Sequence, residues 1–593
     1  MHRYLEGRAS LPIFMCGNRI QSEERCLKEK RDIVYFGLYV LLIVGFYEYG
    51  IQKIYGFSIL GDEFGYWANA AVLAGYDWSS CAQASAYYSY GYGILLAIPL
   101  VLCKTPLSAY RMAVGMNALF LCGAFWFLQK ILQGLFTHSD RDRRVFSLLA
   151  AAFYPVSLYY MKMTLTETLL FFLYCCVCYL MQQFLKEGRR RDLFGLMAVL
   201  VYLFFVHMRT VGILTACVVI LVMHGRKRKD QRRTILAGAA VFLLFFLAGM
   251  FLKVTFNQAV YGTAEAALQD VNDIGGQAGR LSELLSWGGL WHLAVSCVGK
   301  LFYIGMASFG TVYFAVGYCI RHIRERISQF LLLSLLGQFG ISAVFMTRSG
   351  RIDGVIYGRY NDFLMPVYIG IGLLAMFSCK HMIIKVFTCI VSHGCMAPFL
   401  LWYVEQKNLN DFKGYFAAGI GYTFTLTQGD RIDDFRPELL EAYLVCTLLA
   451  VLLAACVCVA RRFDRLVWIL SVFVCVEIYG AMVINKNYTY WFNDVNLECM
   501  GVITYLEEHE RPQIVYLDCG GFLYEDLVQF YLPEQKIEIV GLSEIEVGIR
   551  ERDFGTGYVL VEQNYPYLEE MRTLAKPVAE GANLVLFTIE TLK

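Results

Sequence analysis

Long runs of apolar residues, separated by short polar connections, make up most of the chain. About twenty apolar residues in a helix cross the hydrocarbon core of a bilayer, so each long run predicts a membrane-spanning helix. Thirteen runs reach or approach this length, at about 33 to 49, 106 to 134, 145 to 161, 165 to 185, 193 to 206, 209 to 224, 234 to 254, 294 to 320, 328 to 346, 363 to 379, 384 to 404, 438 to 460 and 466 to 485. The two runs near residue 200 are separated only by His207 and Met208, so they could also form one long helix.

The pattern differs at both ends of the chain. Residues 1 to 32 are polar and basic, and they predict a cytosolic N-terminal arm. Over 487 to 593, strand-like runs alternate with helical or turn segments, which predicts a small α/β domain. The strand-like runs are Ile514–Leu517, Ile537–Val540, Tyr558–Val561 and Leu584–Phe587. This tail lacks a nucleotide-binding fingerprint and a nucleophile elbow, so we expect it to recognise an acceptor or to cover a membrane site.

Composition agrees with this pattern. Apolar residues make up 58% of the chain and charged residues only 17%, with a mean hydropathy of +0.49. Such values are typical of an α-helical polytopic membrane protein, in which residues 33 to 486 form the transmembrane domain. The net charge of +2 gives no support for a nucleic-acid partner.

Lysine and arginine predict the orientation, because short loops rich in these residues stay in the cytosol. Every second connection is basic, and thirteen spans place all of these connections on the side of the N-terminus. We therefore expect a multi-pass plasma-membrane protein with a cytoplasmic N-terminus and an extracytoplasmic C-terminal domain. The basic connections are 141 to 144, 186 to 191, 226 to 233, 321 to 326, 380 to 385 and 461 to 465.

An acidic pair, Asp62 and Glu63, follows the first apolar run and lies in the predicted external connection over 50 to 105. Carboxylates held against a bilayer are costly unless they contact water, a cation or a substrate, so the pair predicts a functional site. Two solvated loop acids are the alternative.

The residues around this pair resemble a known superfamily. Gly61-Asp62-Glu63 is followed by Tyr66-Trp67-Ala68, by the tyrosine-rich stretch 87 to 92, and by Ala109-Tyr110-Arg111. This arrangement resembles the GT-C integral-membrane glycosyltransferases, and within them glycosyltransferase family 39, with its protein O-mannosyltransferases and aminoarabinose transferases. The resemblance implies thirteen spans, a catalytic first external loop and a polyprenyl-phosphate-linked sugar donor. It leaves a lipid, a protein or a polysaccharide as the acceptor.

The resemblance also implies roles for the acids. Asp62 matches the catalytic position, where a carboxylate takes the proton of the acceptor hydroxyl in an inverting displacement, an effect of about 10² to 10⁴ in rate. Glu63 is expected to orient the acceptor or to help hold a cation. Glu167, at the start of the fourth span, could share a divalent cation, Mg²⁺ or Mn²⁺, with Asp62. Alternatively, Glu167 complements the helix dipole beside a threonine cap.

A departing lipid phosphate needs fixed cations. Lys162, Arg209 and Arg359 are the candidates, and snorkelling of each long side chain to the membrane interface is the alternative. Tyr66, Tyr88 and Tyr92 are candidates for contacts with the sugar, although tyrosines also gather at membrane interfaces for amphipathic reasons.

The sequence thus predicts an inverting membrane glycosyltransferase with an Asp base. The rival is a polytopic transporter or flippase of lipid-linked sugars, in which Asp62 and Glu63 are gating or coupling charges. A non-catalytic envelope-assembly protein is a third possibility. Transporters more often place coupling charges within broken helices near the bilayer midplane, whereas the charges here are predicted at helix ends.

Overall fold

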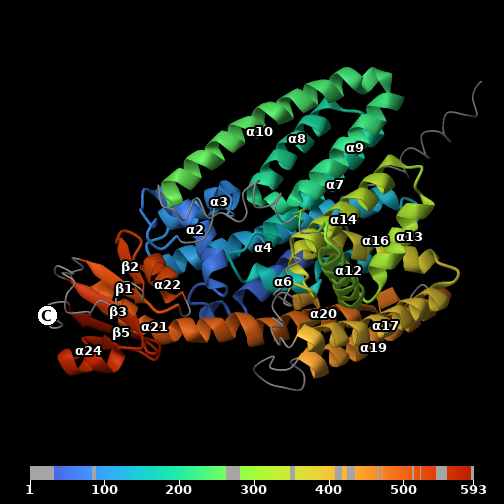
Figure 1. The fold of residues 1–593 in the computed structure, drawn as a ribbon. Coiled ribbons are helices and arrows are strands. Elements are labelled where there is room, and N and C mark those ends of the chain that lie inside the picture. Colours follow the sequence, from blue (N-terminus) through green and yellow to red (C-terminus); the bar gives the residue numbers. More distant parts are fainter. Residues whose placement is uncertain are drawn as a thin grey trace, which may run out of the picture.

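The structure is a computed structural model of a helical bundle with a small sheet domain at one end (Figure 1). It describes residues 32–82, 88–261, 281–282, 284–346, 354–407, 417–421, 423, 435–463, 467–468, 470–509, 513–520, 523–541 and 557–588. The predicted cytosolic arm, residues 1 to 31, lies outside the described residues.

Nine helices in the described part of the chain are long and apolar enough to cross a membrane. Each coincides with one of the apolar runs, which confirms the polytopic membrane class. They are Asp32–Lys53, Pro106–Leu135 (α4), Glu167–Glu187 (α7), Met208–Lys227 (α9, Val211–Lys227, with its leading turn), Lys229–Val260 (most of α10, Arg232–Tyr261), Trp287–Ala307 (α12), Arg326–Phe345 (α14), Met382–Lys407 (α17) and Glu438–Arg462 (most of α19, Phe435–Arg462).

The remaining apolar runs form shorter helices, so the count of thirteen spans stays a prediction. The run at 145 to 161 is divided into α5, Arg141–Ala152, and α6, Pro155–Met161, because a proline cannot continue the helix before it. The other short helices are α8, Arg190–Val206, α16, Met365–Ser378, and α20, Ser471–Ile484.

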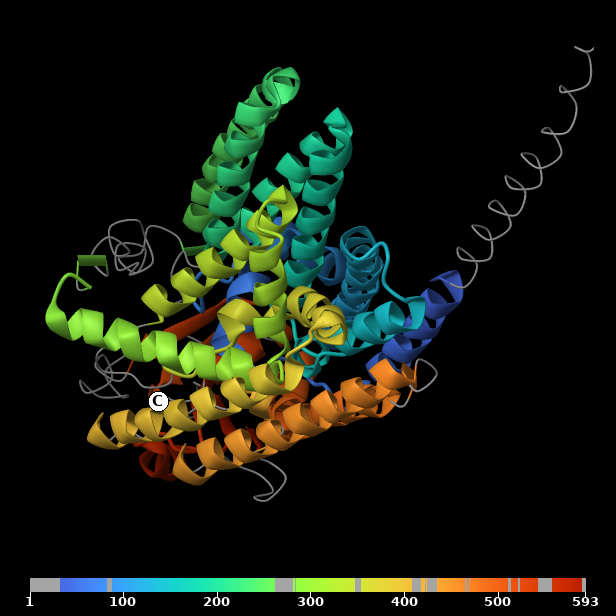
Figure 2. The same cartoon turned by 90° about the vertical axis from the view of Figure 1, so that its right-hand side faces the viewer.

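Two details of the helix pattern are now settled. The prediction of one helix over 294 to 320 is wrong, because a turn with positive φ at Phe309 and Gly310 separates α12 from α13, Thr311–Arg321. The runs near residue 200 form two helices, α8 and α9, joined by a 3-10 turn at Met208–Thr210. Helices α8, α9 and α10 stand together on one side of the bundle, and α17 lies beside α19 (Figure 2).

Much of the predicted first external connection is helical. After a short 3-10 turn at Ile51–Lys53, α2 spans Leu60–Ala74 and α3 spans Tyr90–Leu102. The two helices pack together, and a Cβ at Gly65 of α2 would lie 2.2 Å from the Tyr88 ring. Glycine at this position therefore lets Tyr88 lie directly against the first turns of α2. A four-residue helix, α15, Arg359–Asp362, precedes α16.

The C-terminal domain is a five-stranded sheet with the order β2-β1-β3-β5-β4. Its strands are β1, Ile514–Asp518, β2, Ile537–Gly541, β3, Tyr558–Glu562, β4, Ala579–Glu580, and β5, Leu584–Thr588. Strands β2, β1 and β3 are parallel, whereas β5 is antiparallel to both β3 and β4. Helices α22, Tyr524–Tyr531, and α24, Leu568–Leu574, complete the α/β fold, and all four strand-like runs are confirmed.

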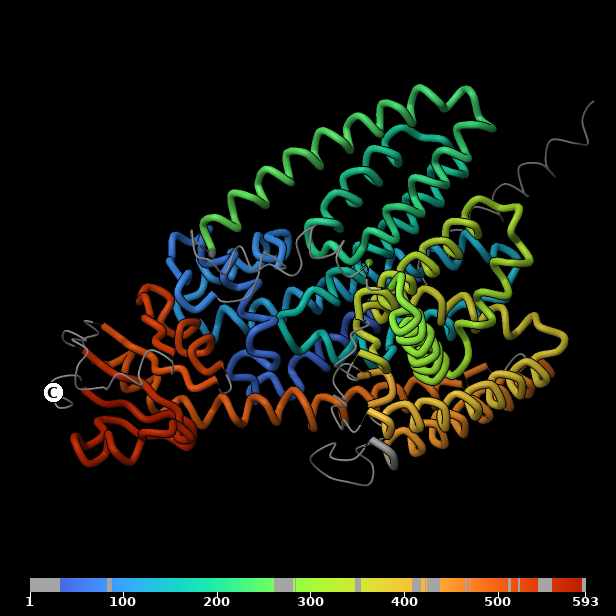
Figure 3. Tube along the Cα trace, viewed as in Figure 1, coloured from blue at the N-terminus to red at the C-terminus, as the bar shows by residue number. Residues whose placement is uncertain are grey.

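One continuous helical stretch joins the bundle to this domain (Figure 3). Helix α20 leads through a π-helical segment, Asn485–Tyr490, into α21, Trp491–Glu508. The domain boundary predicted at residue 487 falls inside this stretch, and the sheet begins only at Ile514.

The C-terminal domain covers the α2 region. Phe530 of α22 is buried, and its ring centroid lies 4.9 Å from that of Phe57 and 5.0 Å from that of Trp67. The hydroxyl of Tyr531 donates to the carbonyl of Tyr55 at 2.6 Å. The indole of Trp78 donates to the carbonyl of Pro533 at 2.9 Å. Aromatic packing with two hydrogen bonds therefore fixes the domain on the segment that carries Asp62.

We expect Phe530→Ala to loosen this docking, because truncating a buried phenylalanine costs about 3–5 kcal/mol. Limited proteolysis of the detergent-purified protein should cleave the variant between the bundle and the C-terminal domain faster than the wild type. Tyr567→Ala, which truncates a ring that is 37% exposed, is the control and should leave the rate unchanged. Equal cleavage of the Phe530 variant and the wild type would contradict the role of this contact.

Candidate active site

Asp62 lies in the first turn of α2, where the positive end of the helix favours a carboxylate. Its side chain is 26% exposed. One carboxylate oxygen accepts a hydrogen bond from the hydroxyl of Tyr88 at 2.5 Å, and the other forms an ion pair with Arg359. Asp62 therefore combines access from outside with two fixed partners.

Glu63 faces the interior and is fully buried. Its carboxylate accepts from the backbone N–H groups of Ser58 (2.7 Å) and Ile59 (3.0 Å), from the hydroxyl of Tyr110 (2.6 Å), and from both the N–H (2.7 Å) and the hydroxyl (2.6 Å) of Thr164. The predicted contact of Glu63 with an acceptor or a cation does not fit this geometry, because five donors already occupy its oxygens. Glu63 instead ties α2 to α4 and to the segment before α7.

Arg359 joins two acids that are far apart in the sequence. Its guanidinium pairs with Asp62, and its Nε lies 2.5 Å from Oε1 of Glu167. The same oxygen of Glu167 accepts from Nη2 of Arg209 at 2.8 Å. The site is therefore a chain of alternating charges, which we call the charge chain, in the order Asp62, Arg359, Glu167 and Arg209.

The charge chain runs from a partly exposed end into the protein. The exposed fraction falls from 26% for Asp62 to 7% for Arg359 and 2% for each of the other two side chains. Arg209 also lies over the ring of Tyr360, 4.9 Å from its centroid, in a cation–π contact. Buried arginines with this many contacts are not snorkelling to the interface, so that alternative is wrong for Arg209 and Arg359.

The pairing shifts the ionisation of the two groups at the outer end. Burial is the largest single effect and would raise the pKa of Asp62, but the Arg359 guanidinium, helped by Tyr88 and Arg209, lowers the pKa below its ordinary value. For Arg359, burial lowers the pKa, and the carboxylates of Glu167 and Asp62 more than compensate, so the pKa rises well above its ordinary value. Asp62 is thus a carboxylate at neutral pH, and Arg359 keeps its charge.

Glu167 begins α7, but it does more than complement the helix dipole, because it holds both arginines. Its second oxygen, Oε2, has no hydrogen-bond partner among the described residues. Glu167, Asp362 and Tyr160 are among the residues that line a cavity of about 10 Å³, which is room for a single water molecule.

The arrangement does not fit the predicted divalent cation. Arg359 lies between Asp62 and Glu167, so a guanidinium holds the position that a shared cation would need. Within the described ranges, three or more His, Cys, Asp or Glu side chains nowhere converge on one point. We therefore assign no step to a metal ion.

Lys162 lies apart from the charge chain. It is fully buried, and its ammonium donates to the carbonyls of Tyr47 and Tyr49, each at 2.7 Å. The predicted contact with a donor phosphate does not fit, because Lys162 caps the C-terminal carbonyls of the first span.

The three candidate tyrosines play different parts. Tyr88 belongs to the site through its hydrogen bond to Asp62. Tyr66 and Tyr92 are buried behind it, and the Tyr66 ring contacts both of the others edge to face. The hydroxyl of Tyr92 lies 3.4 Å from Oδ1 of Asn117. Direct contact of Tyr66 or Tyr92 with a sugar does not fit this burial, and they form the wall that supports Tyr88.

Sequence reasoning missed Asp362. One of its oxygens accepts from the hydroxyls of Tyr303 (2.7 Å) and Tyr154 (3.4 Å), and burial raises its pKa to about 7. The available signal was its spacing, because Asp362 lies three residues after Arg359 and so shares one face of a helical turn with it. The tyrosine partners gave no such signal, since Tyr154 directly precedes α6 and Tyr303 lies in α12.

Solved structures with a similar fold are known. No family model matches the chain, and no curated protein matches it. The structure of ArnT from Cupriavidus metallidurans in the apo state is similar, with a TM-score of 0.53, 13% identity, and coverage of 94% of this chain and 98% of that chain. The chain has the GT-C fold. ArnT from the same organism bound to undecaprenyl phosphate gives a TM-score of 0.52, again with 13% identity, over 93% of this chain and 97% of that chain.

The different surroundings of Asp62 and Glu63 let their roles be separated experimentally. Glu63→Gln places amide hydrogens against donors, so we expect it to destabilise the fold by about 1–3 kcal/mol and to lower the thermal denaturation midpoint in detergent. Asp62→Asn should change this midpoint much less, because Arg359 keeps its ion pair with the buried Glu167. A larger loss of stability in the Asp62 variant would contradict this division.

Proposed function

We propose that the protein is a membrane glycosyltransferase that transfers a monosaccharide from a polyprenyl-phosphate donor to an acceptor on the extracytoplasmic face. The observation that carries this proposal is the charge chain, with a carboxylate at its accessible end and two arginines behind it. The GT-C fold supports the same class, and one of the similar ArnT structures is bound to undecaprenyl phosphate.

The parts of the charge chain suit the two ends of such a reaction. Asp62 takes the proton of an acceptor hydroxyl while the hydroxyl oxygen attacks the anomeric carbon. The bond from that carbon to the phosphate oxygen breaks, and its electron pair leaves on the phosphate. Arg359 is placed to bind the phosphate and stabilise its growing charge, because a guanidinium matches phosphate oxygens in geometry. A single displacement inverts the anomeric centre.

The ion pair between Asp62 and Arg359 adds a coupling between donor binding and base strength. In the structure Arg359 holds the pKa of Asp62 down, which makes Asp62 a weak base. A donor phosphate competes for the same guanidinium. Once Arg359 turns to the phosphate, the pKa of Asp62 rises and the carboxylate accepts a proton more readily. The acceptor would then be deprotonated only when the donor is bound.

Glu167 and Tyr88 position the reacting groups in this proposal. Glu167 holds Arg359 and Arg209 through one oxygen, so both guanidinium groups stay near the place where the phosphate would bind. Tyr88 donates to one oxygen of Asp62 and leaves the other to Arg359 or to the acceptor. The acceptor class, whether lipid, protein or polysaccharide, depends on surfaces beyond these side chains.

Asp62→Asn tests the base. We expect sugar transfer from synthetic polyprenyl-phosphate sugars to fall by about 10² to 10⁴, because the amide cannot take the proton. Donor binding should be unchanged or tighter, since Arg359 loses a competitor. Asp77→Asn, which neutralises an exposed acid of the same connection, is the matched control. It should remain active, because its ion pair with Lys536 lies at the surface, where such pairs contribute little. Full transfer by the Asp62 variant would overturn the assignment.

Arg359→Gln tests the coupling through pH. With Arg359 present, the lowered pKa of Asp62 keeps the base ionised, so kcat/KM for the wild type should stay flat down to about pH 5. Without the guanidinium, burial of Asp62 dominates and its pKa rises. The residual activity of the variant should therefore fall at a higher pH than that of the wild type. An unshifted profile would contradict the coupling.

A further inference from the structure

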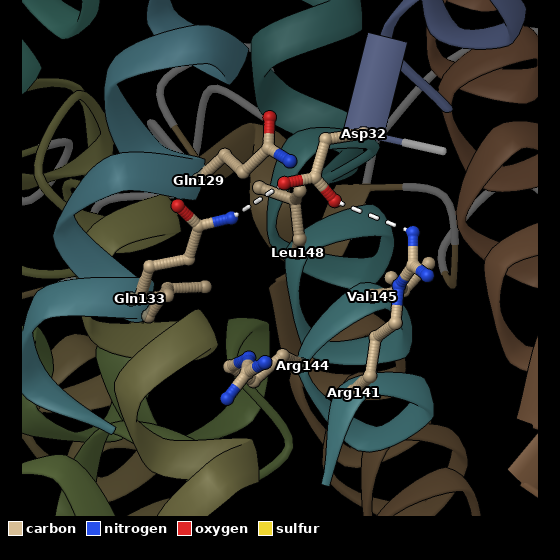
Figure 4. A pocket seen from close by; sticks show the side chains of 8 residues that line it. Asp32, Gln129, Gln133, Arg141, Arg144, Val145 and Leu148 are labelled. Atoms are coloured by element: carbon tan, nitrogen blue, oxygen red, sulfur yellow. Dashed lines mark hydrogen bonds and ion pairs between the residues drawn. The ribbon is translucent and has the colours of Figure 1, made fainter. Parts of the chain in front are cut away.

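A second cavity lies at the other end of the first span. It has a volume of about 270 Å³ and lies between the start of that span, the end of α4 and the start of α5 (Figure 4). The opposite end of the same span contacts Lys162 and leads to the α2 region. The cavity is thus separated from the charge chain by the length of a membrane-spanning helix, on the predicted cytosolic side.

Two arginines line this cavity, and only one of them is paired with a carboxylate of the described residues. Arg141 lies 3.4 Å from a carboxylate oxygen of Asp32, whose other oxygen accepts from the amide of Gln133 at 3.0 Å. Arg144 has no carboxylate within ion-pair distance in the described segments. Its Nη1 donates to the carbonyls of Phe136 (3.1 Å) and Ser139 (2.6 Å), which leaves the rest of the guanidinium available to the cavity.

Gln129 adds a buried polar atom to this cavity. It is 5% exposed, and its side-chain oxygen has no hydrogen-bond partner among the residues that the structure describes. Its side chain faces the cavity next to Asp32 (Figure 4). Because the oxygen and nitrogen of an amide can be exchanged, Gln129 can present a donor to a bound group. A buried polar side chain without a partner is costly unless a ligand or water satisfies it.

The rest of the lining indicates a lipid. Leu132, Val145 and Leu148 supply an aliphatic wall beside the cations. The adjoining span presents exposed apolar side chains where lipid tails would lie, including Val34 at 58% and Leu38 at 52%. A ligand that fits both surfaces carries a negative charge on an apolar body.

We propose that this cavity binds the phosphate of an anionic phospholipid from the cytosolic leaflet. Arg144 and Gln129 donate to the phosphate, and the aliphatic wall contacts the glycerol and the first part of the acyl chains. Anionic lipids concentrate in that leaflet, and basic pockets between membrane helices bind their headgroups. The volume suits a headgroup rather than a whole lipid.

The N-terminal arm is a poorer occupant on charge. Residues 28 to 31 of the sequence are Lys, Glu, Lys and Arg, so their net charge is positive, like that of the arginines that line the cavity. The inference does not depend on the glycosyltransferase proposal, because it uses only the cavity and its place in the membrane.

Native mass spectrometry of the full-length protein in detergent tests the inference. Phosphatidylglycerol should bind at least about tenfold more tightly than phosphatidylcholine with the same acyl chains, because only the first carries a net negative charge. Arg144→Gln should remove this preference. Arg324→Gln is the matched control, since it removes an exposed arginine from another basic connection on the same predicted side.

Further arms keep the test decisive. Arg144 also caps α4, so Gln129→Met provides a variant that leaves those contacts intact, and it should weaken phosphatidylglycerol binding severalfold. Equal binding of the two lipids, or equal losses in the Arg144 and Arg324 variants, would overturn the inference. Full displacement of phosphatidylglycerol by inorganic phosphate would assign the cavity to a soluble anion and would overturn the lipid.

Discussion

Arg359 is the residue on which the site depends. Its guanidinium is 7% exposed and lies between the carboxylates of Asp62 and Glu167, which are 297 and 192 residues away in the sequence. A buried charge is tolerated only with partners, so the inner members of the charge chain depend on one another. The charge chain therefore requires α2, α7, α15 and the turn before α9 to meet at one place.

The two adjacent acids point to different sides of α2 and therefore have different roles. Successive residues on a helix point about 100° apart. Asp62 consequently lies on the accessible side of α2, whereas the side chain of Glu63 is buried and accepts five hydrogen bonds. The buried acid fixes the position of the helix, and this gives its neighbour a defined place for chemistry. The docked C-terminal domain adds to this rigidity through Phe530 and Tyr531.

The structure separates two kinds of polar cluster in the membrane domain. The charge chain is internally matched, with each charge beside an opposite one, which suits a site that must stay assembled until a phosphate competes for Arg359. The cavity near Asp32 is not matched in this way, because Arg144 donates only to backbone carbonyls and the side-chain oxygen of Gln129 has no partner among the described residues. A cluster whose charges are all paired is stable without a ligand, whereas buried polar groups without partners indicate a bound ligand or water.

The sequence by itself determined the membrane class, the apolar runs that form the nine long helices, and four of the five strands of the tail. It also named four residues that the structure brings together in the charge chain: Asp62, Glu167, Arg209 and Arg359. Bilayer thickness fixes the length of an apolar run, and charges at helix ends stand out against it. Only the tertiary structure decided that Arg359 joins two acids, that Glu63, Lys162 and Tyr92 face inward, and that the run over 294 to 320 breaks at Phe309. Most of those outcomes depend on how each helix is rotated or on partners distant in the sequence, such as Tyr47 for Lys162 and Glu167 for Arg359, which local pattern does not encode.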